Sequence, residues 1–482
     1  MDKHGIYTKD IPTSVLSTTT AGTNPVVFGT APVHLTARAT APVNEPVLCN
    51  SYKEAVEVFG YSDNWEDFTL CEFMYSHFQL FGQAPVIFVN VLDPEEHKSV
   101  VVPAAAALVD DAVTLEVEGI LLDTLTVKSD DDTTTYVRDT DFIAEFDKNG
   151  YVVVTRKSTG AIPAADAALK IGYAKLDPSA VQSADVIGGI DGTTGKRSGL
   201  ELLQQVFPRF GLVPGLLLAP GFSHDPLVAA AMLTKASSIN EHFKCLALLD
   251  IPTDTVTNYT LAPEWKTENN IVSERQILCY PKVRLEDKLF HLSTQLAGVI
   301  CQTDQTNGGV PVASPSNRTL QINGALLSAE SDLYLGPEEA NYLNANGIVT
   351  ALNFVGGWKA WGNRTAAYPG VTDPINAFIP IRRMFDWISN AVILTYWQKL
   401  DNPANKRLIE SVTDGINIWL NGLQAVGYIL GGRVEFLKEE NSTTDMMDGK
   451  LQFHLFVTPP SPAQEFDFLL EYDAQYLAAL TA

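Results

Sequence analysis

The segment GLLLAPGFSHDPLVAAAMLTKASSINEHFKCLALLDIP (residues 215–252) decides the fold class. It begins with the apolar run GLLLAP (Gly215 to Pro220), which predicts a buried strand. Asp225 and Pro226 are the residue types expected at the N-cap and first position of a helix, and PLVAAAMLTKASSIN supplies that helix. KCLALLDIP (Lys244 to Pro252) predicts the next strand. A strand, a helix and a strand in this order form the repeating unit of a layered α/β sheet.

The same alternation extends in both directions. Towards the N-terminus, VVFGTAP (Val26 to Pro32) and PVLCN (Pro46 to Asn50) predict strands. Ser51 and Glu54 predict a capping box for a helix that ends at Gly60. A helix over 69–81, the strand APVIFVNVLDP, the strand RQILCYPKV, a helix over about 289–302 and a helix from Pro337 continue the pattern. Two long helices, 384–397 and 404–422, and the strands GRVEFL, KLQFHLFV and EFDFLLEY end the chain.

Residues 95–185 have a different pattern. AVTLEVEG, TLTVKS, TTYVRD and YVVVTRKS alternate in polarity and are separated by the turn signals DDD, KNG and STG. This predicts a β-sandwich or barrel-like domain inserted into a discontinuous α/β core, 26–94 and 186–345. We expect an N-terminal arm (1–25) before the core, a C-terminal α+β domain (346–462) after it, and a C-terminal arm (463–482).

Composition excludes several classes of protein. A length of 482 residues exceeds one ordinary core and predicts several domains. The 33 basic and 57 acidic residues give a net charge of −24, the wrong sign for a nucleic-acid partner. The five scattered cysteines lie in apolar runs and predict buried thiols in a reducing compartment. No apolar run has the length of a membrane span and the N-terminus lacks a signal-peptide core, so we expect synthesis in the cytoplasm without membrane insertion.

The sequence contains no pattern typical of a catalytic, cofactor or metal site. GGIDGTTGKRSG (Gly188 to Gly199) departs from a phosphate loop, because Ile190 replaces its first glycine and Arg197 its magnesium-binding hydroxyl residue. Ser223, His224 and Asp225 are sequence neighbours and predict a helix cap instead of a triad. The histidines have no metal-ligand spacing, and Asp130 to Asp132 predict a solvated turn. We therefore expect no enzyme, although the α/β alternation leaves a nucleotide- or small-molecule-dependent enzyme as the alternative.

Four stretches in the C-terminal part carry a family resemblance: GWKAWGNRT (357–365), INAFIPIRR (375–383), SVTDGINIWL (411–420) and GKLQFHLFVTPPSP (449–462). Their order resembles that of contractile tail sheath proteins, which surround the rigid tube of myophages, R-type bacteriocins and related injection systems. The N-terminal quarter is similar more loosely, through GTAP, NEPVL and GQAPVIFVNV. Residues 95–185 depart from the shorter members of this family.

The resemblance implies a structural subunit that polymerises helically around an inner tube and contracts to drive the tube through a cell envelope. The implied partners are further copies of the chain, the inner tail tube protein, and the baseplate and tail terminator proteins. The implied location is a virion tail or contractile particle assembled in the bacterial cytoplasm. The choice between phage, bacteriocin and another injection system stays open, and the acidic insertion leaves a non-contractile surface array as a further alternative.

The resemblance also implies arms at both termini that add strands to neighbouring subunits. The candidate strand residues are Ile6, Tyr7, Thr8, Val15 and Leu16 in the N-terminal arm, and Phe466, Phe468 and Leu470 on one face of EFDFLLEYD. Thr458, Pro459 and Pro460 separate this arm from the preceding strand. The alternative is that both termini pack on their own domain. The implied tube-contacting helix is 404–422 with Lys406 and Arg407, which equally fit a solvated helix end.

Overall fold

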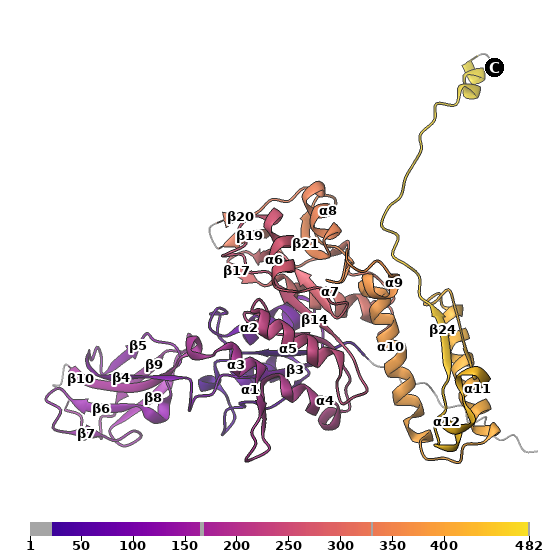
Figure 1. Ribbon diagram of the computed structural model, residues 1–482. Coiled ribbons are helices and arrows are strands. Elements are labelled where there is room, and N and C mark those ends of the chain that lie inside the picture. The colour runs from indigo at the N-terminus through magenta and orange to yellow at the C-terminus, as the bar shows by residue number, and fades with distance from the viewer. Residues whose placement is uncertain (1–21, 164–167, 329–330, 481–482) are drawn as a thin grey trace, which may run out of the picture.

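The computed structural model describes residues 22–163, 168–328 and 331–480. Figure 1 shows a central α/β core with a β-rich lobe on one side and a narrow lobe of helices and two strands on the other. The chain then leaves the narrow lobe as a long extended segment that ends far from the core. In the described residues, no helix is both long and apolar enough to cross a membrane.

A nine-stranded sheet organises the core in the described part of the chain, in the order β18-β22-β21-β15-β14-β13-β1-β3-β2. The inner strands pair in parallel: β3 (Val86–Asn90), β1 (Asn24–Gly29), β13 (Pro214–Leu218), β14 (Leu246–Asp250), β15 (Gln276–Cys279) and β21 (Ile348–Asn353). Antiparallel strands close both edges: β2 (Val47–Cys49), β22 (Trp358–Trp361) and β18 (Arg318–Thr319). The mixed α/β fold class is confirmed.

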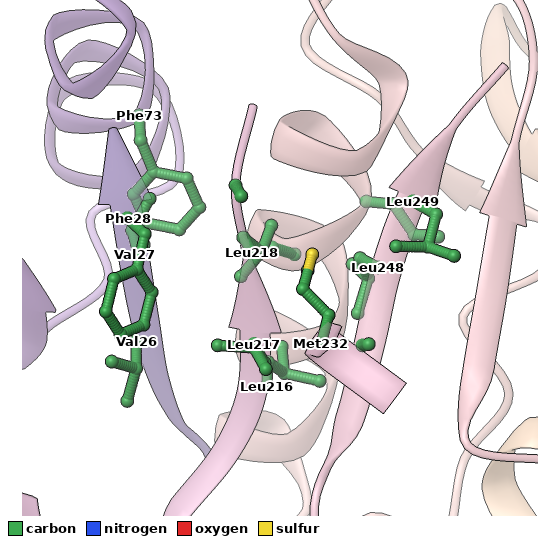
Figure 2. Packing of buried hydrophobic residues seen from close by; sticks show 14 of the residues in the cluster. Val26, Val27, Phe28, Phe73, Leu216, Leu217, Leu218, Met232, Leu248 and Leu249 are labelled. Atoms are coloured by element: carbon green, nitrogen blue, oxygen red, sulfur yellow. The ribbon is translucent and has the colours of Figure 1, made fainter. Parts of the chain in front are cut away.

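Most residues of the inner strands are apolar because helices cover the sheet. Figure 2 shows Val26 to Phe28, Leu216 to Leu218 and Leu248 to Leu249 on adjacent strands, all buried, with Phe73 and Met232 lying against them. Met232 belongs to α5 (Pro226–Ser237), whose predicted N-cap is confirmed, since Asp225 Oδ1 accepts a hydrogen bond from Leu227 N at 2.8 Å.

Among the other core helices, those at 52–59, at 69–80 and from 337 agree with the prediction, whereas the helix predicted over about 289–302 begins at Leu292, because Leu289 and Phe290 belong to a strand. Helix α1 (Tyr52–Phe59) is capped by Ser51, whose Oγ accepts a hydrogen bond from Glu54 N at 3.2 Å. The remaining helices are α2 (Thr69–Met74) with the π-helix η2 (Tyr75–Leu80), α3 (Ser183–Ile187), η5 (Gly199–Leu202) with α4 (Leu203–Phe210), α6 (Ala262–Glu268), α7 (Leu292–Thr306) and α8 (Pro337–Ala345). A smaller antiparallel sheet contains β17 (Lys288–Phe290), β16 (Lys282–Leu285), β19 (Gly324–Ser328) and β20 (Ser331–Asp332).

The β-rich lobe contains two antiparallel sheets with a hydrophobic cluster of their own. One sheet contains β4 (Lys98–Ala107), β10 (Ala168–Leu176), β6 (Thr126–Ser129) and β7 (Thr135–Tyr136), and the other β5 (Ala112–Leu115), β9 (Val152–Arg156) and β8 (Phe142–Phe146). His34 joins this lobe to the core: its Nε2 accepts from Gly119 N at 3.3 Å and its ring packs edge-on against Phe146. Burial lowers the pKa of His34 to about 4, so the imidazole is neutral at pH 7.

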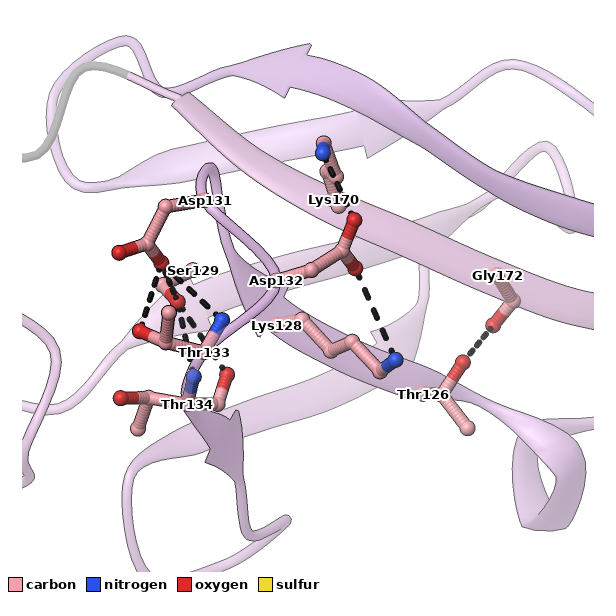
Figure 3. A network of polar contacts seen from close by, with 9 residues as sticks. All are labelled: Thr126, Lys128, Ser129, Asp131, Asp132, Thr133, Thr134, Lys170 and Gly172. Atoms are coloured by element: carbon pink, nitrogen blue, oxygen red, sulfur yellow. Dashed lines mark hydrogen bonds and ion pairs between the residues drawn. The ribbon is translucent and has the colours of Figure 1, made fainter.

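The acidic turn between β6 and β7 is satisfied by its own neighbours (Figure 3). The Asp131 carboxylate accepts hydrogen bonds from Ser129 and Thr133, and these lower its pKa to about 2. Asp132 pairs with Lys170 at 2.8 Å and lies 3.6 Å from Lys128. The carboxylates of Asp131 and Asp132 therefore have protein partners in an exposed turn.

Helix α10 (Ile379–Tyr396) connects the core to the narrow lobe. Ile379 belongs to the core cluster, whereas Met384, Trp387 and Ile388 belong to a separate cluster with residues of α11 (Lys406–Ala425). The narrow lobe also contains β23 (Gly431–Glu435), α12 (Thr443–Met447) and β24 (His454–Thr458). The structure differs from the expected boundary at 345/346, because β21 and β22 pair into the large sheet; the division lies along α10.

Candidate functional site

The N-terminal arm leaves the core at a buried ion pair. Its predicted strand residues, Ile6, Tyr7, Thr8, Val15 and Leu16, lie outside the described residues. The adjoining Thr23 is held between α7 and α10: its hydroxyl donates to Asp304 and accepts from Arg383 Nη2 at 3.0 Å. Arg383 also binds the Asp304 carboxylate with both terminal nitrogens.

This ion pair is almost inaccessible to solvent, with Asp304 2% and Arg383 6% exposed. A buried charge without its partner costs several kcal/mol, so each group requires the other. The adjacent Arg382 pairs instead with Asp386 at 3.1 Å, which in turn binds Arg275. The two consecutive arginines of the sequence motif thus bind two different carboxylates and fix the start of α10 against the core.

The C-terminal arm extends away from its own chain. Residues 459–473 form neither helix nor strand, so the predicted strand EFDFLLEY is absent from the isolated chain. Its predicted apolar face is solvent-exposed, with Phe466 74%, Phe468 83% and Leu470 98% accessible. A strand requires a neighbour to accept and donate its backbone hydrogen bonds, and the arm has none among the described residues. The alternative that this terminus packs on its own domain does not hold for residues 465–480.

The beginning of this arm is anchored before it leaves the molecule. Gln464 Nε2 donates to Asn363 Oδ1 at 2.8 Å, and Gln464 Oε1 accepts from Arg364 Nη2 at 2.9 Å. The Arg364 guanidinium lies 3.7 Å from the ring centre of Phe378 and 4.4 Å from that of Tyr368. These stacking contacts hold the guanidinium in place. The WGNRT motif therefore fixes the point from which the C-terminal arm extends.

The narrow lobe contains a sheet of only two strands in the described residues. β23 and β24 pair antiparallel, from Gly431 opposite Thr458 to Glu435 opposite His454. Val434, Leu455 and Val457 belong to the cluster that faces α11, while Arg433 stacks on Phe456 on the other face. Both outer edges of the pair lack a strand neighbour within the described chain. Such edges are suited to pairing with another segment.

Helix α11 presents the predicted basic residues at its exposed first turn. Asn405 caps the helix by accepting from Leu408 N at 2.9 Å. Lys406 lies 3.5 Å from Glu410 in a solvent-exposed pair, and Arg407 is also exposed. Positive side chains at a helix N-terminus oppose the helix dipole, and the exposed Lys406–Glu410 pair offsets this only weakly.

The glycine-rich segment 188–199 forms a hairpin between β11 (Gly189–Ile190) and β12 (Arg197–Ser198). The backbone amides of Thr193 and Thr194 both donate to Asp191 Oδ1, each at 2.7 Å. A protein carboxylate thus occupies the amides that a phosphate would need.

A buried polar cluster at the ends of β13 and β14 serves packing. Asp250 Oδ1 accepts from Ser293 N at 3.0 Å at the start of α7, and Ser223 Oγ lies 3.4 Å from Asp250 Oδ2. Burial raises the pKa of Asp250. Burial opposes protonation of His291, but the charge of Glu72, 2.8 Å away, outweighs it and raises the His291 pKa. In the described residues no group of three His, Cys, Asp or Glu side chains is arranged to hold a metal ion.

Comparisons with known proteins agree with this geometry, although no protein-family model matches the chain. The tail sheath protein of Burkholderia phage BcepMu is 30% identical over 466 residues, which cover 94% of this chain and 93% of that protein. A putative prophage major tail sheath protein of Pseudomonas aeruginosa (strain UCBPP-PA14) is 28% identical over 316 residues, covering 64% of this chain and 77% of that protein.

Among solved structures, the fold is similar to the contracted sheath complex of the extracellular contractile injection system PVC. The TM-score is 0.58 at 14% identity, over 98% of this chain and 99% of that chain. The identity and coverage of the BcepMu relative show the family, and the structural likeness shows the same fold. The chain belongs to the contractile tail sheath proteins.

Proposed function

We propose that this chain is a structural subunit that polymerises helically around an inner tube and contracts to drive the tube through a target cell envelope. The observation that supports it best is the C-terminal arm, which is anchored at Gln464 and then exposes an alternating apolar strand sequence to solvent. Exposed apolar side chains in such an arrangement mark an interaction surface. The proposed role is mechanical and not enzymatic.

The acceptor for the arm is the two-stranded sheet of the narrow lobe on a neighbouring copy. An arm strand that adds to the edge of β24 gains main-chain hydrogen bonds, and its alternate side chains fix the register. Phe466, Phe468 and Leu470 face the same way as Leu455 and Val457 in this arrangement, towards the apolar layer over α11. The contact is head-to-tail, because donor and acceptor differ, and it therefore propagates into a helical array.

The N-terminal arm acts in the same way through Ile6, Tyr7, Thr8, Val15 and Leu16. Its expected end at residue 25 moves to Thr23, because β1 of the core sheet begins at Asn24. Arms that stay connected while the cores move as rigid bodies keep the lattice continuous during contraction. Residues 95–185 are the proposed inserted β-domain, with a hydrophobic cluster of its own.

Helix α11 is the proposed contact with the inner tube protein. Lys406 and Arg407 are exposed and unfavourably placed for their own helix, which fits a role towards acidic groups on a partner. Exposed ion pairs are individually weak, which suits a contact that must release. The baseplate and tail terminator proteins are the proposed partners at the two ends of a virion tail or contractile particle, assembled in the bacterial cytoplasm.

Negative-stain electron microscopy of the purified chain tests the proposal. The full-length chain is compared with variants that lack residues 465–482 or residues 1–20. We expect hollow tubes or rings from the full chain and their loss in both truncations. Monodisperse particles from the full chain at high concentration, or tubes that survive deletion of both arms, contradict assembly through exchanged arms.

A further inference from the structure

The C-terminal arm ends in a short helical segment that nothing in its own chain covers. This segment is η9 (Ala474–Leu480). At its start, Asp473 Oδ1 accepts a hydrogen bond from Gln475 N at 2.9 Å. Tyr476 and Leu480 are 80% and 81% exposed, and Leu477 is half-exposed. In the described residues, no hydrogen bond or ion pair joins 465–480 to the rest of the molecule. An isolated helical turn with three exposed apolar side chains requires a partner surface.

A groove of about 540 Å³ opens beside α11 in the narrow lobe. Its apolar lining comes from Ile409 of α11, Phe436 after β23, Met446 of α12 and Leu451 before β24. The lining also includes polar and charged residues: Asn405, Lys406, Glu410, Thr413 and Asp414. The groove therefore offers apolar side chains beside polar and charged ones.

The groove lies at the end of the sheet that a donated strand would reach. Phe436 directly follows the end of β23 at Glu435, and Leu451 precedes the start of β24 at His454. A strand added antiparallel to β24 runs in the same direction as β23, so its C-terminal end arrives at this groove. Residues 465–472 are that strand, and Asp473 with η9 follows without a linker.

We propose that η9 of one copy docks in the α11–α12 groove of the copy that accepts its arm strand. This inference rests on the proposed strand donation and adds a second, side-chain-specific contact to it. Tyr476, Leu477 and Leu480 fill the apolar lining. Met446, an adaptable side chain, closes over them. In Figure 1 the arm carries η9 away from α12 of its own chain, which favours a second copy as the acceptor.

Cysteine cross-linking in assembled particles tests the docking. The full-length double variant Tyr476→Cys/Met446→Cys is assembled, oxidised mildly and run on a non-reducing gel. We expect a ladder of linked chains. The native cysteines are all buried and give little background. The matched control is Tyr476→Cys/Ile418→Cys, because Ile418 is exposed on α11 but does not line the groove.

Particles that assemble without a ladder, or with the same ladder in the control, overturn the docking and leave strand donation intact. A full-length chain that forms no particles contradicts the proposed function itself. Deletion of residues 474–482 provides a second measurement: it spares the strand, so particles still form, but at a protein concentration raised at least about tenfold. An unchanged critical concentration after this deletion also overturns the docking.

Discussion

Substitution of two neighbouring leucines in the C-terminal arm distinguishes strand donation from non-specific hydrophobic association. Leu469 and Leu470 are 96% and 98% exposed in the isolated chain. Neither Leu469→Asp nor Leu470→Asp therefore changes the stability of the free subunit. In a strand, however, the two side chains point to opposite faces. Leu470 shares its face with Phe466 and Phe468, and this apolar face is the one we expect to pack on the neighbouring subunit.

The expected loss of assembly free energy follows from the solvent exposure of Leu470 in the free subunit. Burial of a leucine contributes about 1.5–3 kcal/mol, and because Leu470 is almost fully exposed beforehand, nearly all of it is gained on assembly. Leu470→Asp forfeits that amount and adds the cost of burying a carboxylate. At about 1.4 kcal/mol for each factor of ten, the critical concentration for assembly rises at least about 10- to 100-fold. Leu469→Asp, on the solvent side, leaves it within a few-fold of the wild-type value.

The assay is sedimentation of assembled particles over a range of protein concentrations, with urea unfolding of the free subunit as the check on stability. Equal effects of the two substitutions would refute a strand with one buried face, because a non-specific apolar tail makes no distinction between adjacent positions. Normal assembly of Leu470→Asp would refute burial of this face altogether.

Three further predictions concern the subunit itself. Arg383→Met leaves the buried Asp304 carboxylate without its partner and costs about 3–5 kcal/mol in urea unfolding, whereas Arg383→Met with Asp304→Leu removes both charges and recovers most of this loss. The pKa of His34 is about 4 in the folded state and 6.5 in the unfolded state, so the unfolded state binds more protons between these pH values. The free energy of unfolding therefore falls by about 3 kcal/mol as the pH drops from 6.5 towards 4. His34→Gln removes this titration and flattens the dependence of the urea midpoint on pH in that range. Lys406→Ala with Arg407→Ala changes the free energy of unfolding by less than about 1 kcal/mol, because relief of the unfavourable charge–dipole contact is set against loss of the exposed Lys406–Glu410 pair, while co-sedimentation with the tube protein decreases.

The local parts of the fold could be predicted from the sequence because their signals lie close together in the chain. Ser51 with Glu54 and Asp225 with Pro226 fix helix starts within three residues, and the structure places both helices there. The apolar run 215–220 predicts a covered strand, since a parallel strand is buried on both faces. The boundary at 345/346 could not be predicted in this way, because the assignment of β21 depends on its pairing with β15, about seventy residues earlier.

The anchors of the arms had no local signal. Thr23, Asp304 and Arg383 are brought together over hundreds of residues, and Gln464 meets Arg364 across a hundred. A pair of arginines within the apolar stretch INAFIPIRR was the only hint, because such charges require buried partners. The strand predicted for EFDFLLEY is absent from the described residues, since backbone pairing is a property of two segments and none of the described residues supplies the second.

Helix α10 connects the two arms mechanically. Its N-cap residue, Phe378, stacks under Arg364, which holds Gln464 at the start of the C-terminal arm. One turn later Arg383 binds Thr23 at the start of the N-terminal arm. The first turns of α10 therefore hold the anchors of both arms. A force applied to one arm can be transmitted to the other through side chains of α10, without passing through the large sheet. The same helix then enters the cluster of the narrow lobe through Met384, Trp387 and Ile388, so it connects the two anchors on the core with that lobe.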